Sequence, residues 1–470
     1  MTHANHRQGT YDNLCNDFVA IAFTKKAETL SNLRQQWAET CLRHQPIYPS
    51  PKRWQQYVFD HKEKVVGVLK DLAIADLGLS VTISGLFDQI WEACRSAGIA
   101  PHTVNHSLGF WGRTEKLPSR RILEFTTMCG HEKVSSNLVW HLAEKVKNGS
   151  LSIEEAASEM GRPCLCNIFN EVRAAMLLQE LVADLKAGKI SKPQSATQKQ
   201  VKAKTWGMIV DERRCTGCLD CVPYCPMSAI VAMTERGVVA IDPEECVECG
   251  TCFRTSVCPT GAIVPGVIEW PHTLRPDLSD PYVPDQSLVL GGTARGRSPD
   301  RRSLLSRQAD SGGPARSHDV KDNDVTGRYG PGRVGIIVEM GRPVLGTTLR
   351  EVQKVTEALA ALGIPTLKLR EIGDLVVDES TGRLRDDILD EKVNRCYVEV
   401  EVSLEQAPIV LQRLREVARG VNTVFAVGLI SLVGGDGSVP TIAVAQELGM
   451  EVSINGKTNV GLGRPLVRFS

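Results

Sequence analysis

Eight cysteines within residues 215–258 constrain the fold of this chain more than any other feature. They stand in two runs that share a spacing and a Cys-Pro ending: Cys215-x2-Cys218-x2-Cys221-x3-Cys225-Pro226 and Cys246-x2-Cys249-x2-Cys252-x5-Cys258-Pro259. Three closely spaced thiolates can reach three corners of one iron–sulfur cubane, whereas a structural zinc ion takes four ligands. Because the cysteines come in threes with a remote fourth, the pattern favours two [4Fe-4S] clusters over two zinc sites.

The spacing also predicts which cysteines share a cluster. In bacterial two-cluster ferredoxins the first three cysteines of a run bind one cluster and the fourth binds the other. We therefore expect one cluster to be bound by Cys215, Cys218, Cys221 and Cys258. We expect the second to be bound by Cys225, Cys246, Cys249 and Cys252. The crossed ligands would join the two halves and keep the clusters close enough for electron transfer.

Charge and hydropathy exclude several classes of function. The 470 residues carry 55 basic and 55 acidic side chains, so no overall positive field draws the chain to a nucleic acid or an anionic membrane. The longest apolar stretch, near 424–433, is well short of the roughly 20 residues that span a bilayer. The first residues are polar and predict no signal peptide. Most of the fifteen cysteines stand at metal-ligand spacings, and such thiols stay reduced in the cytosol, so we expect a cytoplasmic protein.

We expect a multidomain α+β protein whose first domain, residues 1–188, is mostly helical. Ser135 is placed to cap one helix, and Ser152 and Glu155 make a capping box for a second. Apolar residues at helical spacing predict a third helix over about 169–187. Residues 189–205 are polar, basic and without periodicity, which predicts a linker.

The remaining chain divides into three parts. Residues 206–268 predict a ferredoxin-type domain, and residues 269–333, rich in Gly, Ser, Pro and Arg, predict an extended linker or lid. Residues 334–470 predict an α/β domain with helices packed on a mixed sheet. Its expected strands are 334–339, 396–402 and 422–430, and its expected helices are 348–362 and 408–419.

A second group of cysteines, Cys129, Cys164 and Cys166, stands just before two of the predicted helices. Helix N-termini lower the pKa of a nearby thiol and favour the metal-binding thiolate. Together with His131 these cysteines predict a third site, for a [4Fe-4S] cluster or for zinc. The alternative is that they are reduced, packed cysteines of a helical bundle. His131 and His106 are candidate catalytic residues, although either could be an ordinary buried polar side chain.

Two glycine-rich segments follow the cysteine array: NDVTGRYGPGRVGIIVEMGRPVLGTTLREV (323–352) and NGKTNVGLGRPL (455–466). With these segments, residues of about 205–470 resemble the iron–sulfur proteins known as 6-hydroxynicotinate reductases. The resemblance implies a part in nicotinate degradation, by ferredoxin-dependent reduction of a CH–CH bond in the pyridone ring to give a tetrahydro-6-oxonicotinate. It does not cover residues 1–188, and the Arg-rich stretch at 294–318 looks like an insertion.

The same segments carry candidate substrate-binding residues. Arg342 and Arg464 each precede a proline in a glycine-rich turn, and Lys457 and Asn459 lie close to Arg464 in the sequence. A guanidinium can bind a ring carboxylate through two parallel hydrogen bonds. The alternative is that the glycines serve tight turns and the arginines make surface ion pairs.

We therefore expect an oxidoreductase that takes electrons from a low-potential donor such as ferredoxin and reduces a small N-heteroaromatic carboxylate. No nucleic-acid or membrane partner is expected, and no nicotinamide or flavin fingerprint is present in the sequence. Two other functions stay open. One is an electron-transfer subunit without its own substrate site. The other is a lyase or dehydratase with an open-iron cluster at the second cysteine group.

Overall fold

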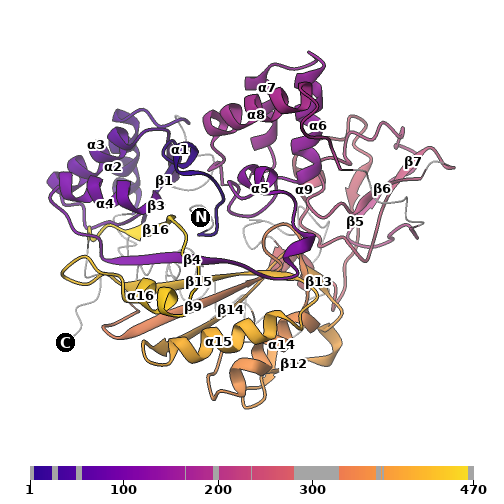
Figure 1. Ribbon diagram of the computed structural model, residues 1–470. Coiled ribbons are helices and arrows are strands. Elements are labelled where there is room, and N and C mark those ends of the chain that lie inside the picture. Colours follow the sequence, from indigo (N-terminus) through magenta and orange to yellow (C-terminus); the bar gives the residue numbers. More distant parts are fainter. Residues whose placement is uncertain are drawn as a thin grey trace.

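An antiparallel sheet of eight strands forms the frame of the molecule in the computed structural model (Figure 1). The structure describes residues 5–23, 30–48, 56–164, 166–193, 201–233, 235–279, 328–366, 372 and 375–463. The strand order is β14-β9-β15-β4-β16-β3-β1-β2. The strands are β1 (Phe18–Phe23), β2 (Gln56–Phe59), β3 (Ser80–Leu86), β4 (Thr103–Gly112), β9 (Arg333–Met340), β14 (Cys396–Ser403), β15 (Val424–Leu432) and β16 (Asn455–Asn459).

The sheet is built from two halves with the same order of elements. One half is β1-α2-β2-α3-β3-α4-β4, and the other contains β9, α14, β14, α15, β15, α16 and β16 in the corresponding places. In each half the first strand lies between the second and the third, as in β2-β1-β3 and β14-β9-β15. The fourth strands are exchanged, because β4 pairs with β15, β16 pairs with β3, and β4 and β16 pair with each other.

This exchange corrects two of the expectations. Residues 1–188 do not form a separate helical domain, since beside their helices they supply four strands to the same sheet as residues 334–463. The sheet is also not mixed, because each pair of neighbouring strands is antiparallel. The strands β3 and β4 have partners near the other end of the sequence, where local patterns give no sign of them, whereas β1 pairs with β2 and β3, which are close to it in the chain.

Six helices of the described part of the chain cover one face of the sheet. They are α2 (Leu30–Arg43), α3 (Lys62–Ala75), α4 (Phe87–Ser96), α14 (Leu349–Ala360), α15 (Ala407–Ala418) and α16 (Pro440–Glu447). The predicted stripe of α14 is confirmed, since Leu349, Val352 and Val355 are buried and share an apolar core with Val398 and Val400 of β14. The strands and helices expected between 334 and 430 are all present, with ends shifted by a few residues at most.

The opposite face of the sheet is polar near its centre and is nevertheless buried. Lys457 pairs with both Ser84 and Asn105 across neighbouring strands, and all three side chains are buried. The N-terminal segment crosses this face: Asn5 Nδ2 donates to Asn105 Oδ1 at 3.0 Å, and the carbonyl of Arg7 accepts from Asn455 Nδ2 at 3.1 Å.

A helical unit covers the same polar side of the sheet, above β4 in Figure 1. It consists of α5 (Arg120–Thr126), α6 (Ser136–Lys147), α7 (Ile153–Gly161) and α8 (Glu171–Lys186), with the short α1 (Tyr11–Leu14) nearby. The expected caps are confirmed: Ser135 Oγ accepts from Leu138 N at 2.9 Å, and Ser152 and Glu155 form the reciprocal capping box.

The cysteine-rich domain lies beside α6 at the right of Figure 1. Its elements are β5 (Met208–Val210) paired with β8 (Ile263–Pro265), β6 (Ile230–Met233) paired with β7 (Val238–Ile241), and α9 (Thr251–Arg254). It contacts the helical unit closely, since Ser135 Oγ donates to the carbonyl of Pro223 and Asn137 Nδ2 donates to Ser228 Oγ at 3.0 Å.

The smaller elements are η1 (Thr114–Lys116), α10 (Leu274–Ser279), β10 (Thr347–Thr348) paired with β13 (Lys392–Val393), β11 (Val376–Asp378) paired with β12 (Arg383–Leu384), and η4 (Asp386–Ile388). Two of the expected linkers are ordered where the structure describes them. Lys204, placed in the 189–205 linker, is buried, and the 269–333 segment contributes α10 and the buried Tyr329. Most of that segment, 280–327, lies outside the described residues.

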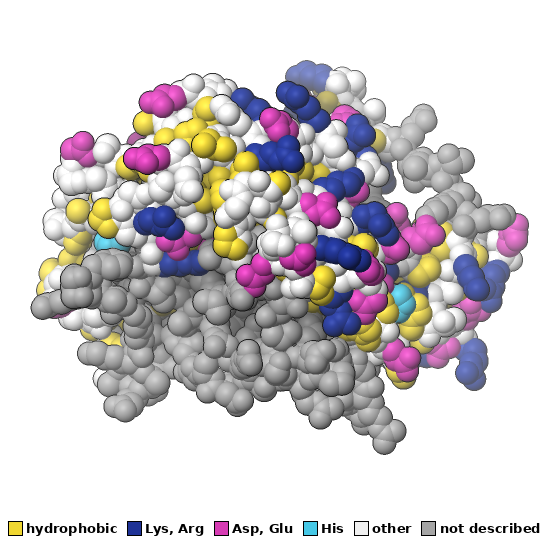
Figure 2. Space-filling model, turned by 90° about the horizontal axis from the view of Figure 1, so that it is seen from below, with side chains coloured by type: hydrophobic (Ala, Val, Ile, Leu, Met, Phe, Trp, Pro, Cys, Tyr) yellow, Lys and Arg dark blue, Asp and Glu magenta, His cyan; other side chains and the backbone are white. Residues whose placement is uncertain are grey.

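The described helices include none with the length and apolar character needed to cross a membrane. On the face shown in Figure 2, basic and acidic side chains are interspersed, in line with the equal numbers of the two charges in the sequence.

A buried ion cluster joins the N-terminal segment to α8 and makes a first prediction. Asp17 Oδ2 accepts from Arg7 Nη1 and from Arg173 Nη1, both at 3.0 Å, and all three side chains are fully buried. Replacing Asp17 by Asn would leave two buried arginines without their common carboxylate. We expect the free energy of unfolding to fall by about 3–5 kcal/mol. The midpoint of urea unfolding under anaerobic conditions measures this, with the exposed Asp12→Asn as the matched control. An equal midpoint for both variants would contradict the prediction.

Candidate functional site

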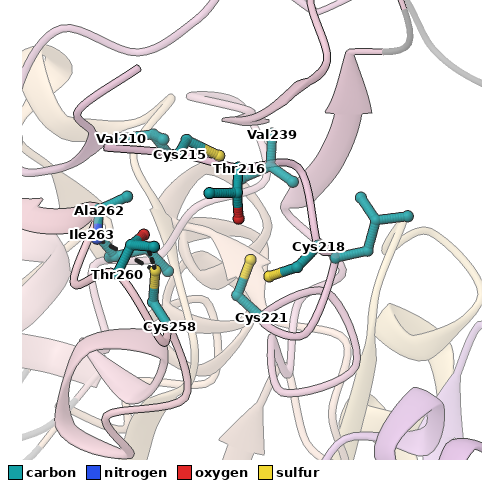
Figure 3. A pocket seen from close by; sticks show the side chains of 11 residues that line it. Val210, Cys215, Thr216, Cys218, Cys221, Val239, Cys258, Thr260, Ala262 and Ile263 are labelled. Carbon is teal, nitrogen blue, oxygen red and sulfur yellow. Dashed lines mark hydrogen bonds between the residues drawn. The ribbon is translucent and has the colours of Figure 1, made fainter. Parts of the chain in front are cut away.

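Four of the array cysteines surround one pocket. Cys215, Cys218, Cys221 and Cys258 line a cavity of about 300 Å³, counted with the space open to solvent. Figure 3 shows their sulfurs facing a common space, with Cys258 brought in from the other cysteine run. This is the set that the spacing assigns to one cluster.

The other four array cysteines also lie together. Cys252 interacts electrostatically with Cys225, Cys249 and Cys246, and Cys225 interacts with Cys249 and Cys246. Burial raises the pKa of the Cys225 thiol to about 12, and the same effect raises the pKa of Cys221 to about 12. Thiolates in such a place need a nearby positive charge, which bound iron supplies. The donor sets therefore fit iron–sulfur clusters.

The internal repeat of the sequence is also a repeat of backbone shape. The residue before the second cysteine of each run, Gly217 or Glu248, has a positive φ, and so does the residue after it, Leu219 or Gly250. After the last cysteine of each run the chain turns back so that a backbone N–H reaches the sulfur. Ala229 N donates to Cys225 Sγ at 3.2 Å, and Ala262 N donates to Cys258 Sγ at 3.1 Å. Such hydrogen bonds orient the thiolate and adjust the potential of a cluster.

A buried lysine lies beside the second set of cysteines. Lys204 Nζ is 3.4 Å from Cys246 Sγ and forms an ion pair with Glu248, whose other carboxylate oxygen accepts from Met208 N at 2.8 Å. Burial lowers the pKa of Lys204, while Cys246 acts in the opposite direction. On the same side, Arg275 Nη1 donates to the carbonyl of Cys246 at 2.8 Å.

The second cysteine group converges in the structure. Cys166 Sγ lies 2.9 Å from His131 Nδ1, and the thiols of Cys129 and Cys164 are hydrogen-bonded to each other. All four side chains are buried. Among the described residues no three His, Cys, Asp or Glu side chains are arranged to hold a single metal ion. The eight array cysteines are no exception, because four of them line a cavity and do not converge on the position of a single ion.

Next to His131 lies a buried cluster of ionisable side chains. Arg342 Nη2 donates to the carbonyl of Gly130 at 2.7 Å, its Nη1 donates to Glu339 Oε2 at 2.8 Å, and its Nε is 3.4 Å from Glu132 Oε1. His6 Nε2 lies 3.2 Å from the same Glu132 oxygen. The sharp turn after β9 that positions Arg342 needs Gly341, whose φ is +84° and where a Cβ would approach Gly346 to 2.8 Å.

Two arginines flank one aromatic ring in this cluster. The guanidinium carbons of Arg342 and Arg395 lie 5.2 and 5.3 Å from the ring centre of Tyr397, which pairs with Glu339 across the sheet. Burial holds the pKa of His131 well below its usual value, and the positive charges of Arg395, Lys133 and Arg342 act in the same direction. Burial alone would raise the pKa of Glu132, but Arg342 and His6 hold it below its usual value.

The other predicted site residues do not belong to the buried cluster around Arg342. Lys457 and Asn459 lie on β16, which β4 and β15 separate from β9, and Asn459 Nδ2 donates to Ser80 Oγ at 3.0 Å. His106 lies on the opposite face of the sheet, where it contacts Thr441 Oγ1 at 2.9 Å and burial lowers its pKa to about 4. Arg464 lies outside the described residues.

Several residues of this cluster were missed at the level of the sequence. Glu132, Glu339, Arg395 and Tyr397 carry no motif, and His6 belongs to a polar N-terminal segment. One signal was present: Tyr397 and Glu399 alternate with valines in β14, which normally indicates a face exposed to solvent. Here that face is buried, so the alternation marks a polar interior.

Comparison with known proteins supports the cysteine array. Residues 214–262 match the family model described as a 4Fe-4S dicluster domain. No solved structure matches the chain. The chain therefore contains an iron–sulfur, ferredoxin-like domain, and it carries at least one [4Fe-4S] cluster for electron transfer or oxidoreduction.

The crossed ligation of the array makes a second prediction. Replacing Cys258 by Ala removes the one ligand that the second run would give to the first cluster. The anaerobically purified variant should lose about four iron atoms per chain relative to the parent. The magnetic coupling between two reduced clusters should also disappear from the electron paramagnetic resonance spectrum. Cys396→Ala, in the apolar core under α14 and α15, is the control and should keep both. A fully coupled spectrum from the Cys258 variant would contradict the assignment.

Lys204 makes a third prediction, which concerns a reduction potential. Its positive charge stabilises the more negative, reduced state of a cluster bound by Cys246. Lys204→Met should therefore make the potential of that cluster more negative, by tens of millivolts. Glu248→Gln, which keeps the lysine, should shift it in the other direction. Redox titration followed by electron paramagnetic resonance measures both shifts, with the exposed Lys202→Met as control. Shifts of the same sign in both variants would contradict the electrostatic explanation.

Proposed function

We propose that this protein is a ferredoxin-dependent reductase of a small, anionic N-heteroaromatic ring such as 6-hydroxynicotinate. The single observation that carries the proposal is the buried cluster of Arg342, Arg395, Tyr397, Glu132 and Glu339 beside the second cysteine group. Buried charges lower stability unless they are paired, and they are often found at functional sites. An electron carrier without its own substrate site has no need of such a cluster in its interior.

The chemistry of the cluster suits a planar anion. Arg342 and Arg395 lie near His131, with the carboxylates of Glu132 and Glu339 against Arg342, and guanidinium groups bind carboxylates in a planar, two-point geometry. Arg342 is already engaged by Glu339, Glu132 and the Gly130 carbonyl. We assign the carboxylate of the substrate to Arg395, whose guanidinium carbon lies 5.3 Å from the ring centre of Tyr397, with Arg342 holding Glu132 and Glu339 in place.

The reaction needs two electrons and two protons for each reduced carbon–carbon double bond. The clusters supply single electrons at low potential when they are bound. The side chains of the polar site have the other tasks: to orient the ring, to exclude water, and to deliver protons from an acid such as Tyr397. Lys457 and Asn459, on a distant strand, are not placed at this site in the proposal.

The test uses the full-length protein under anaerobic conditions. With electrons from dithionite or reduced ferredoxin, 6-hydroxynicotinate should be converted to its tetrahydro-6-oxo product. The conversion is measured by the loss of the ring's ultraviolet absorbance, and the product is identified by nuclear magnetic resonance. NADH alone should give no product, since the sequence carries no dinucleotide fingerprint.

Variants locate the reaction. Arg395→Lys keeps the charge and loses the two-point geometry, and it should weaken substrate binding by about 1.5–3 kcal/mol without changing the iron content. Arg333→Lys is the matched control. Arg333, on β9, forms an ion pair at the surface with Glu401, on the neighbouring strand β14. Equal substrate affinity in both variants would remove Arg395 from the site. Protein with full clusters that reduces no heterocycle but reduces a partner protein would be an electron carrier instead.

A further inference from the structure

The turns after Cys129 and Cys164 have the same backbone shape as the turns after two cysteines of the array. In all four cases the third residue after the cysteine has a positive φ: Glu132 at 56°, Asn167 at 54°, Ser228 at 52° and Gly261 at 61°. Three of these residues are not glycine. A left-handed conformation is unfavourable for residues with a side chain, so it persists where the surroundings require it.

At each of these turns a backbone N–H is hydrogen-bonded to the cysteine sulfur. In the array the backbone N–H of the fourth residue after Cys225 and after Cys258 donates to the cysteine sulfur. At the second group Lys133 N donates to Cys129 Sγ at 3.5 Å, and the backbone N–H of Ile168 is hydrogen-bonded to Cys164. An inert core cysteine has no need of a backbone arranged to stabilise a thiolate. A metal-bound thiolate does.

These turns bring several sulfurs to one place. The thiols of Cys129 and Cys164 are hydrogen-bonded, Cys164 interacts with Cys166, and Cys166 Sγ contacts His131 Nδ1 at 2.9 Å. Exposed fractions of 0% for Cys129, 9% for Cys164 and 5% for Cys166 keep solvent away from all three sulfurs.

The position of this group connects the array with the polar site. Cys129, Cys164 and Cys166 share one apolar core with Tyr224, the residue before Cys225, and Val257, the residue before Cys258, packs against that core. On the other side, the carbonyl of Gly130 is bound by Arg342.

We propose that Cys129, Cys164 and Cys166 bind a third iron–sulfur cluster of the [4Fe-4S] class, between the ferredoxin-type array and the buried polar site. His131 hydrogen-bonds to the Cys166 sulfur and is not counted among the ligands, because its Nδ1 lies at hydrogen-bond distance from that sulfur. The protein thus supplies three thiolates, and the fourth iron is left without a cysteine. The inference does not depend on which substrate is reduced.

Iron content tests the proposal directly. Full-length protein, purified anaerobically and reconstituted with iron and sulfide, should hold about twelve iron atoms per chain, four for each cluster. Mössbauer spectroscopy and inorganic sulfide should give the same total, and zinc should be absent. Saturation at about eight iron atoms would overturn the proposal, and so would eight iron atoms with one zinc ion or with a Cys129–Cys164 disulfide.

Two variants test which cysteines bind the additional iron. Cys164→Ala and Cys166→Ala should each lower the content to about eight, while the coupled spectrum of the array persists and reports intact folding. Cys94→Ala is the matched control and should keep about twelve iron atoms per chain. Cys94 is equally buried, but it belongs to a different apolar core, the one formed with α3 and α4. If either variant fails to fold, the iron content of the parent protein still decides. Twelve iron atoms in both folded variants would place the third cluster elsewhere.

Discussion

The pairing of β4 with β16 is the interaction on which the rest of the structure depends. It joins a strand from the first quarter of the chain to the last described strand, and through it the two halves become one sheet. Backbone groups in a sheet interior need partners, so neither half can satisfy its hydrogen bonds alone. Through β15, which pairs with both β4 and β9, the end of β4 that leads to the Cys129 loop lies near the turn after β9 that carries Arg342.

The polar face of this sheet organises the functional region. A sheet of this kind usually buries one apolar face and exposes the other to water. Here helices cover one face, while the N-terminal segment and the unit α5–α8 cover the other, which stays rich in Asn, Ser, Glu and Lys. Enclosed polar groups of this kind are strongly ordered when they are fully hydrogen-bonded. The result is a rigid, water-poor environment beside three buried cysteines.

Much of the local structure could be predicted from the sequence, because its causes are local. The caps at Ser135 and Ser152 were found from neighbouring residues, and the crossed cysteine sets follow from spacing alone. Among the four N-terminal strands, β3 and β4 have their partners near the other end of the sequence, so no local pattern reveals the pairing. Tyr397 and Glu399 were missed because a polar strand face looks like a solvent-exposed one. Arg342 was a candidate substrate-binding residue because of its glycine-rich turn, but its engagement by Glu132 and Glu339 depends on contacts that no local pattern reveals.

The exchange of fourth strands also sets the order in which the molecule can be assembled during translation. β3 has β16 as a neighbour, so its edge stays open until residues near 459 have left the ribosome. The array cysteines, in contrast, all lie within residues 215–258 and can fold around their clusters much earlier. Domains generally fold as units as the chain emerges, and unpaired strand edges are prone to aggregation. All eight array cysteines of a nascent chain are therefore synthesised while its largest sheet still lacks one of its central strands, and the edge of β3 stays open during that time.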